Sequence, residues 1–185
     1  AMRSRCPRVH GRYDRTWTCA SGVNRLRRKF TTFSRQSRLT KALLLPAWCL
    51  LGIARLMVLL LPFKWLAPLL GRYNGVAAFL PLAGSPEYQR AMSIGRAVRM
   101  AATVTPWQAN CQPQAIAARC LLGLFSVPYS VFYGVANAPE QNMKAHAWVG
   151  CGPVPVTGGY AFDEFTVVAV FAGGVPVDAK QARPA

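Results

Sequence analysis

The sequence predicts an α+β domain in which helices come first and an antiparallel sheet follows. Up to Gly123, apolar residues recur at steps of three and four between helix-start and helix-stop signals. Beyond Gly123, short alternating segments rich in β-branched and aromatic residues are separated by turn residues. Hydrophobic residues make up 52% of the 185 residues, which is enough for the core of one domain over residues 42–173.

Residues 1–41 are predicted to form a basic N-terminal arm. They hold 12 of the 22 Lys and Arg residues and one acid, Asp14. Such an arm suits nucleic acid, anionic lipid, an acidic peptide or plain solvation. It carries no nucleic-acid-binding motif, so nucleic acid is not the expected partner.

Residues 42–71 form the most apolar segment. We expect a helix over 47–61 and a shorter one over 63–71, because prolines at 46, 62 and 68 cap or break helices. Arg55 would lie near the centre of a bilayer, which disfavours a spanning helix. The apolar faces are expected to cover the core or a partner protein, with peripheral membrane contact as the alternative.

The remaining elements follow from caps and turns. Ser85 and Pro86 predict a helix start, and Thr105-Pro106 its end. A further helix is expected from Cys111 to Gly123. Four strands are expected over 128–135, 145–150, 153–157 and 165–171, and a loose tail over 174–185.

The composition excludes several kinds of site. The six acidic residues are scattered, and there are two histidines, so a carboxylate pair and a His-rich metal site are both disfavoured. None of the six cysteines forms a CxxC pair, and a domain of this size needs no disulfides, which predicts reduced cysteines and a cytoplasmic protein, with membrane association as the alternative.

Cys111 and His146 are the candidates for chemistry. A helix N-terminus carries partial positive charge, which stabilises a thiolate, and a nearby imidazole can accept and return the proton. The N–H of Cys111 and the side chain of Gln108 are candidates for holding an oxyanion. Alternatively, Cys111 fills space in the core and His146 is structural, as expected for Cys49 and Cys120 inside apolar helices.

The residues around both candidates match one family. Trp107 to Arg119, His146-Ala-Trp-Val149, the Val156-to-Gly159 turn and Phe165 to Val168 resemble the B protein of lasso-peptide biosynthesis. This family is a transglutaminase-like, papain-related leader peptidase. The resemblance covers about residues 40–171 and implies a papain/transglutaminase-like fold with Cys111 as nucleophile and His146 as base.

The resemblance also implies partners and a cofactor. The family removes the leader from a ribosomally made precursor peptide, needs ATP, and works with an asparagine-synthetase-like cyclase. No nucleotide-binding motif is present in this sequence. Residues 1–41 are too short and polar to be the family's leader-recognition domain, so a separate leader-recognition protein is expected.

One family feature is missing here. Many members place an aspartate about a dozen residues after the histidine, where this sequence reads Thr157-Gly158-Gly159. Asp163, Glu164, Thr157 or a backbone carbonyl could orient the imidazole instead. We choose Asp163 among them. The alternative interpretation is that Asp163 is an ordinary turn residue.

Two further functions stay open. The same cysteine and histidine could support transglutaminase-type crosslinking or deamidation. The chain could also be a non-catalytic docking protein, in which the basic arm and apolar helices recruit a membrane or an acidic chain.

Overall fold

The fold was analysed in a computed structural model, which describes residues 36–137 and 143–174. The helices are α2 (Arg38–Leu60), α3 (Phe63–Leu70), α4 (Ser85–Ala102) and α5 (Cys111–Leu124). The strands are β1 (Arg72–Tyr73), β2 (Tyr129–Asn137), β3 (Met143–Cys151), β4 (Val154–Thr157) and β5 (Thr166–Gly173). The predicted α+β class is confirmed. The predicted tail, apart from Gly174, and nearly all of the predicted arm lie outside the described residues.

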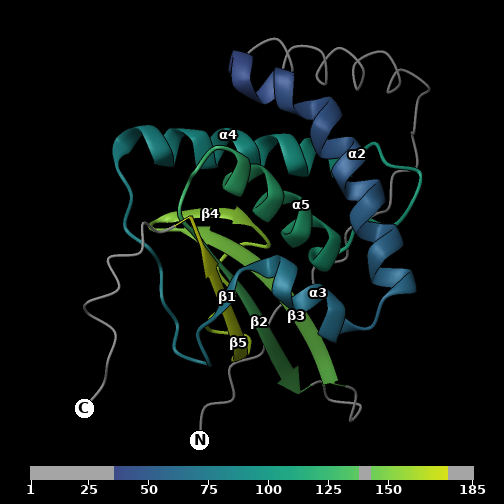
Figure 1. Cartoon of the computed structure of the whole chain (residues 1–185), viewed down its shortest axis with the longest axis vertical. Coiled ribbons are helices and arrows are strands. Elements are labelled where there is room, and N and C mark those ends of the chain that lie inside the picture. Colours follow the sequence, from purple (N-terminus) through teal and green to yellow (C-terminus); the bar gives the residue numbers. More distant parts are fainter. Residues whose placement is uncertain (1–35, 138–142, 175–185) are drawn as a thin grey trace, which may run out of the picture. The chain divides into compact units, whose positions relative to one another are not determined.

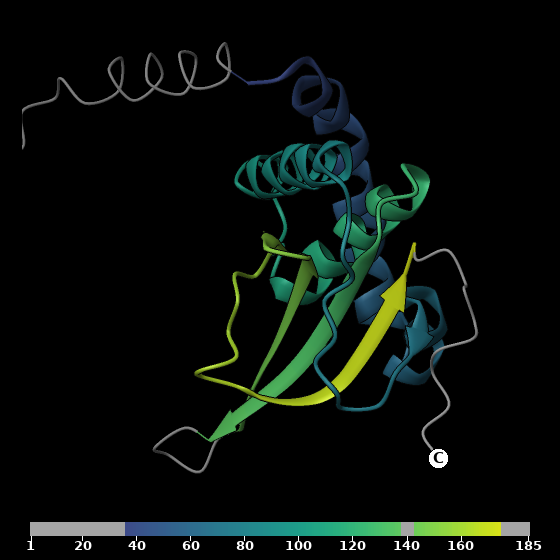
Figure 2. The same cartoon turned by 90° about the vertical axis from the view of Figure 1, so that its left-hand side faces the viewer.

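One antiparallel sheet has the strand order β1-β5-β2-β3-β4. Figures 1 and 2 place α2, α4 and α5 on one side of it. Helix α4 packs on β4, α5 packs on β3 and β4, and α2 packs on α4 and α5. The site described below therefore lies where α5 meets the sheet.

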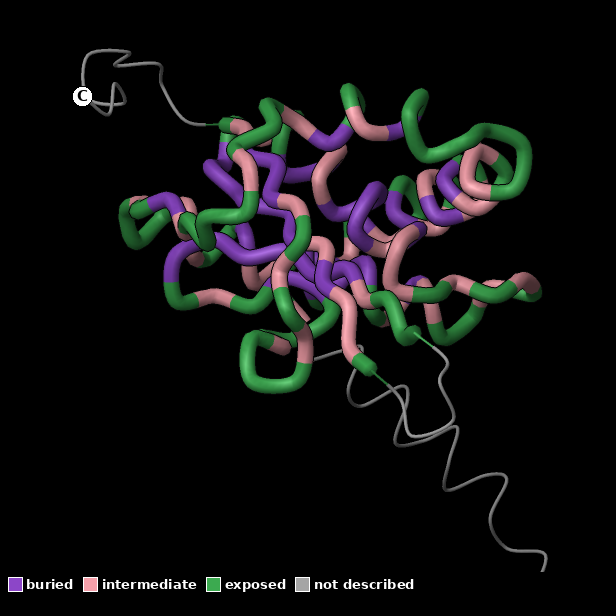
Figure 3. Tube along the Cα trace, turned by 90° about the horizontal axis from the view of Figure 1, so that it is seen from below, coloured by how far each residue is buried: buried purple, intermediate pink, exposed green. Residues whose placement is uncertain are grey.

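The two faces of the sheet bury separate clusters. Figure 3 shows the buried residues at the centre of the fold. The main cluster lies between the sheet and the helices and includes Val131, Ala147 and Val149. A smaller one, on the other face, consists of Phe132, Trp148 and Val170, with Leu80, Ala161, Phe165 and Val167 packed against it. Successive side chains of a strand alternate between these clusters.

Helix α2 begins earlier than predicted. The hydroxyl of Ser37 accepts a hydrogen bond from the N–H of Thr40 at 3.1 Å, so Ser37 caps the helix. Pro46 lies inside α2 instead of ending it. Pro46 and Ala42, whose carbonyl loses its helical partner, are both exposed, and solvent can satisfy that carbonyl. The predicted start at residue 47 is therefore wrong.

Three smaller predictions also need correction. Gly84, and not Ser85, is the N-cap of α4, and α4 ends at Ala102. Pro68 lies within α3. The two-residue strand β1 was not predicted, because its two residues show no pattern of their own and are set only by pairing with β5.

Candidate active site

Cys111 is the first residue of α5. Asn110 is the N-cap with extended backbone and no side-chain cap, and no acidic residue lies in the first turn. Pro113 has no N–H, and Gln114 donates its N–H to the Asn110 carbonyl at 3.2 Å. The N–H of Cys111 has no acceptor within the helix, so the partial positive charge of the helix end remains at this residue.

Three contacts hold the loop before Cys111 in place. The Gln114 side chain donates to the Ala109 carbonyl at 2.7 Å. The Thr105 hydroxyl donates to the Trp107 carbonyl at 3.0 Å. The rings of Trp107 and Trp48 of α2 lie 4.9 Å apart. These contacts fix the direction in which the chain enters α5.

Tyr133 of β2 is the neighbour of Cys111 that the sequence did not reveal. It stands opposite Ala147 of β3, on the helix-facing side of the sheet. Its ring packs at 5.1 Å from Phe63 and 6.0 Å from Phe171. Its hydroxyl is buried and has no hydrogen-bond partner among the described residues. Strand pairing brings Tyr133 to the site, and no sequence motif predicts this position.

The surroundings of Tyr133 keep its hydroxyl protonated. Burial, and then the negative charge of a Cys111 thiolate, raise the pKa of Tyr133 well above its ordinary value. A protonated phenol near the nucleophile is a hydrogen-bond donor at physiological pH. It can therefore stabilise negative charge that develops beside Cys111.

His146 of β3 is oriented by a backbone carbonyl. Its Nε2 lies 3.0 Å from the carbonyl oxygen of Gly158. Gly158 has φ +77°, and a Cβ there would lie 2.7 Å from the carbonyl oxygen of Ala147. Only glycine fits this turn. The contact leaves Nδ1 as the ring nitrogen available for chemistry.

Aromatic rings also hold His146. Its ring lies 5.7 Å from Trp148, with an interplanar angle of 20°, and 5.1 Å from Phe165. His146 thus shares a face of the sheet with Trp148, whereas Ala147 faces α5. The stacking sets the plane of the imidazole.

The structure does not join Cys111 and His146 by a hydrogen bond. They come from elements that pack together, α5 and β3. Cys111 packs against the cluster between the sheet and the helices, whereas the His146 ring lies on Trp148 at the other face of the sheet. β4 pairs with β3 from Val149 to Cys151, so within the described residues the β3 backbone around His146 has no strand on that side. At Ala147 and Trp148, the backbone of Gly158 lies against β3.

The structure also places Asp163 and Gln108, the other two residues predicted for the site. Asp163 is exposed in the turn before β5 and makes no hydrogen bond to His146 in the described part of the chain. The carbonyl of Gly158 lies within hydrogen-bond distance of His146, as in the alternative that the sequence left open, and the role of Asp163 stays a prediction. Gln108 is exposed in the loop before α5, and its oxyanion role stays a prediction.

One other described cysteine, Cys151, is much less reactive than a nucleophile requires. Cys49, Cys111, Cys120 and Cys151 are all free thiols. Burial, and then the charge of Glu87, raise the pKa of Cys151 to about 11, which makes it a poor nucleophile. Within residues 36–137 and 143–174, no group of three His, Cys, Asp or Glu side chains could hold a metal ion.

Comparison with known protein families assigns the fold. The family model of the transglutaminase-like superfamily matches residues 57–170, more than half of the chain. This chain belongs to the transglutaminase-like superfamily. No curated protein and no solved structure matches it significantly. The transglutaminase-like region includes both Cys111 and His146, and membership suggests cysteine peptidase or transglutaminase-type activity.

Proposed function

We propose that this protein is a cysteine peptidase that removes the leader from a lasso-peptide precursor. The observation that carries the proposal is the position of Cys111, a half-buried thiol at the uncapped N-terminus of α5 in a transglutaminase-like domain. The resemblance around Trp107 to Arg119 and His146 to Val149 favours the lasso-peptide substrate.

The reaction follows acyl-enzyme chemistry. The Cys111 thiolate attacks the carbonyl carbon of the scissile peptide bond, and the N–H of Cys111 and the Tyr133 hydroxyl stabilise the oxyanion. The His146 imidazolium gives its proton to the leaving amine nitrogen. Water then attacks the thioester, which releases the leader as a carboxylic acid and restores the thiol.

The proton transfer requires a movement of the His146 ring. Its Nε2 is held by the Gly158 carbonyl, so Nδ1 is the ring nitrogen that has to reach the sulfur of Cys111. Substrate binding supplies this closure, since catalytic hydrogen bonds often tighten only in the substrate complex.

The resemblance supplies the proposed partners. A separate leader-recognition protein would present the precursor, and an asparagine-synthetase-like cyclase would close the ring. The resemblance implies ATP as well, and no step of the proposed reaction runs through it.

The test is cleavage of a lasso-peptide precursor by this protein, with a leader-recognition protein and ATP present. Cys111→Ala is expected to lower the cleavage rate by at least about a thousandfold, because it removes the nucleophile. Cys120→Ala is the matched control, since Cys120 is also a half-buried thiol of α5. It should retain activity.

Mass spectrometry of the products separates the alternatives. Leader removal adds one water across the cut bond, whereas transglutaminase-type crosslinking releases ammonia and leaves the backbone intact. Cleavage that survives Cys111→Ala would show that this thiol is not the nucleophile. Loss of activity in both cysteine variants would point to damage of α5.

A further inference from the structure

From Ala42 onward, the exposed residues of α2 are apolar. Its inner face is buried against the fold through Thr40, Leu43, Ala47, Leu51 and Ala54. Apart from Arg38 at its start, the exposed residues of α2 are Ala42, Leu45, Pro46, Cys49, Ile53, Leu56, Leu59 and Leu60. A continuous exposed apolar face of this kind normally lies against a partner or a membrane.

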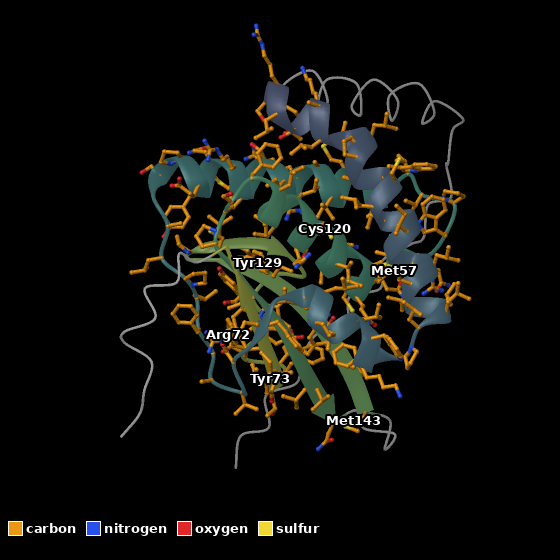
Figure 4. The ribbon with its side chains drawn as sticks, in the orientation of Figure 1. Met57, Arg72, Tyr73, Cys120, Tyr129 and Met143 are labelled. Carbon is orange, nitrogen blue, oxygen red and sulfur yellow. The ribbon has the colours of Figure 1, made fainter. Side chains whose placement is uncertain are left out.

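The apolar stripe continues beyond α2. Leu61, Phe63, Trp65 and Leu69 are exposed in the turn after α2 and in α3, with Trp65 at 65% exposure. We call the exposed apolar residues from Ala42 to Leu69 the outer apolar surface. In Figure 4 mostly carbon side chains project along α2 around the labelled Met57. Much of this surface precedes the region matched by the family, which begins at residue 57.

Positive charge surrounds the outer apolar surface. Between Asp14 and Glu87 the sequence has no acidic residue and 11 basic ones. Arg38 and Lys41 lie at the start of α2, Arg55 lies towards its end, and Lys64 lies in α3. A surface that combines leucines, an exposed tryptophan and flanking cations is complementary to the interface of an anionic bilayer.

We propose that α2 and α3 dock this domain on an anionic lipid membrane, with α2 lying in the plane of the interface. By length and composition, α2 is the one helix in the described part of the chain that could instead cross a membrane. Its inner face, however, packs on α4 and α5, and the Thr40 hydroxyl donates to the Ser93 carbonyl at 3.3 Å. Spanning would break this packing and bury Arg55 in hydrocarbon.

A second copy of the chain fits this surface less well. An isologous pairing would place the basic residues of both copies, Arg55 and Lys64 among them, in one interface, and the sequence has no acidic residue between Asp14 and Glu87 to pair with them. The proposal does not depend on the activity of Cys111, so the Cys111→Ala variant is expected to bind vesicles as the unchanged protein does.

The test is sedimentation of the full chain with phosphatidylcholine vesicles that contain phosphatidylglycerol. We expect binding that weakens in high salt and that is much weaker on pure phosphatidylcholine. The double variant Ile53→Glu/Leu56→Glu should lower vesicle affinity about tenfold or more. Leu82→Glu is the control, because Leu82 is 89% exposed but lies in the segment between β1 and α4.

A second measurement follows Trp65 directly. Lipid-attached quenchers should reduce the tryptophan fluorescence of the bound protein, and the quenched part should be absent in Trp65→Phe. Equal vesicle binding by the double variant and the unchanged protein would overturn the proposal. A dimer in solution that the double variant dissociates would also overturn it, because the surface would then bind a second copy. Membrane-bound protein that resists carbonate extraction would overturn it too, because it would indicate a spanning helix.

Discussion

The Tyr133 hydroxyl is buried without a hydrogen-bond partner among the described residues, and it lies near the nucleophile of the proposed reaction. An unpaired buried hydroxyl destabilises a fold, because it loses its bonds to water and gains none. Such a group is retained where a ligand or a transition state provides the missing partner. For Tyr133, that partner would be the oxyanion.

Tyr133→Phe should therefore separate activity from stability. We expect kcat for precursor cleavage to fall about a hundredfold, as for the loss of one oxyanion donor. The melting temperature should stay the same or rise, because the variant loses only an unsatisfied hydroxyl. Unchanged kcat, or a clearly lower melting temperature, would assign Tyr133 to structure alone.

At the scale of elements, α4 and β4 are held together by a close backbone approach. A Cβ on Gly95 would lie 2.5 Å from the carbonyl oxygen of Val156. The guanidinium of Arg99 also donates to that carbonyl. Glycine is thus needed in α4 so that β4 can approach, and β4 leads directly to Gly158, which orients His146.

Gly95→Ala should force α4 away from β4 and lower the free energy of unfolding by about 1–3 kcal/mol. Gly123→Ala in α5 is the comparison, since nothing lies within 4 Å of its added Cβ. That variant should be neutral or stabilise by up to about 1 kcal/mol. Urea denaturation measures both, and equal effects would show that the approach at Gly95 is not tight.

Local signals in the sequence predicted the helices, the longer strands and the position of Cys111 at a helix start. They could not predict the extent of α2, because the pattern around Pro46 does not show that the carbonyl of Ala42, which Pro46 leaves without its helical partner, faces solvent. They also missed β1 and Tyr133, which depend on pairing between distant segments. The role of the Gly158 carbonyl was foreseen only as one alternative among several.

At the scale of the whole molecule, the buried residues of the described part of the chain lie between Thr40 and Ala172. A chain that begins at residue 36 keeps the Ser37 cap and Thr40, so we expect its melting temperature to match that of the full chain. A chain that begins at residue 42, the boundary predicted from the sequence, loses both and should be about 1–2 kcal/mol less stable.

Thermal unfolding of the two truncated chains checks this comparison. Equal melting temperatures would mean that the first turn of α2 contributes nothing to stability. A chain from residue 36 that fails to fold would mean that the basic arm is part of the core.

The contact between Trp48 and Trp107 connects the two proposed roles of the molecule. Trp48 belongs to α2, and Trp107 precedes Cys111 by four residues. Gly52 leaves so little room that an added methyl group would lie 3.0 Å from the Trp107 ring. A tilt of α2 would therefore push on the Trp107 ring at the entrance of α5. If both proposals hold, lipid binding and precursor binding would be energetically coupled through this pair of indole rings.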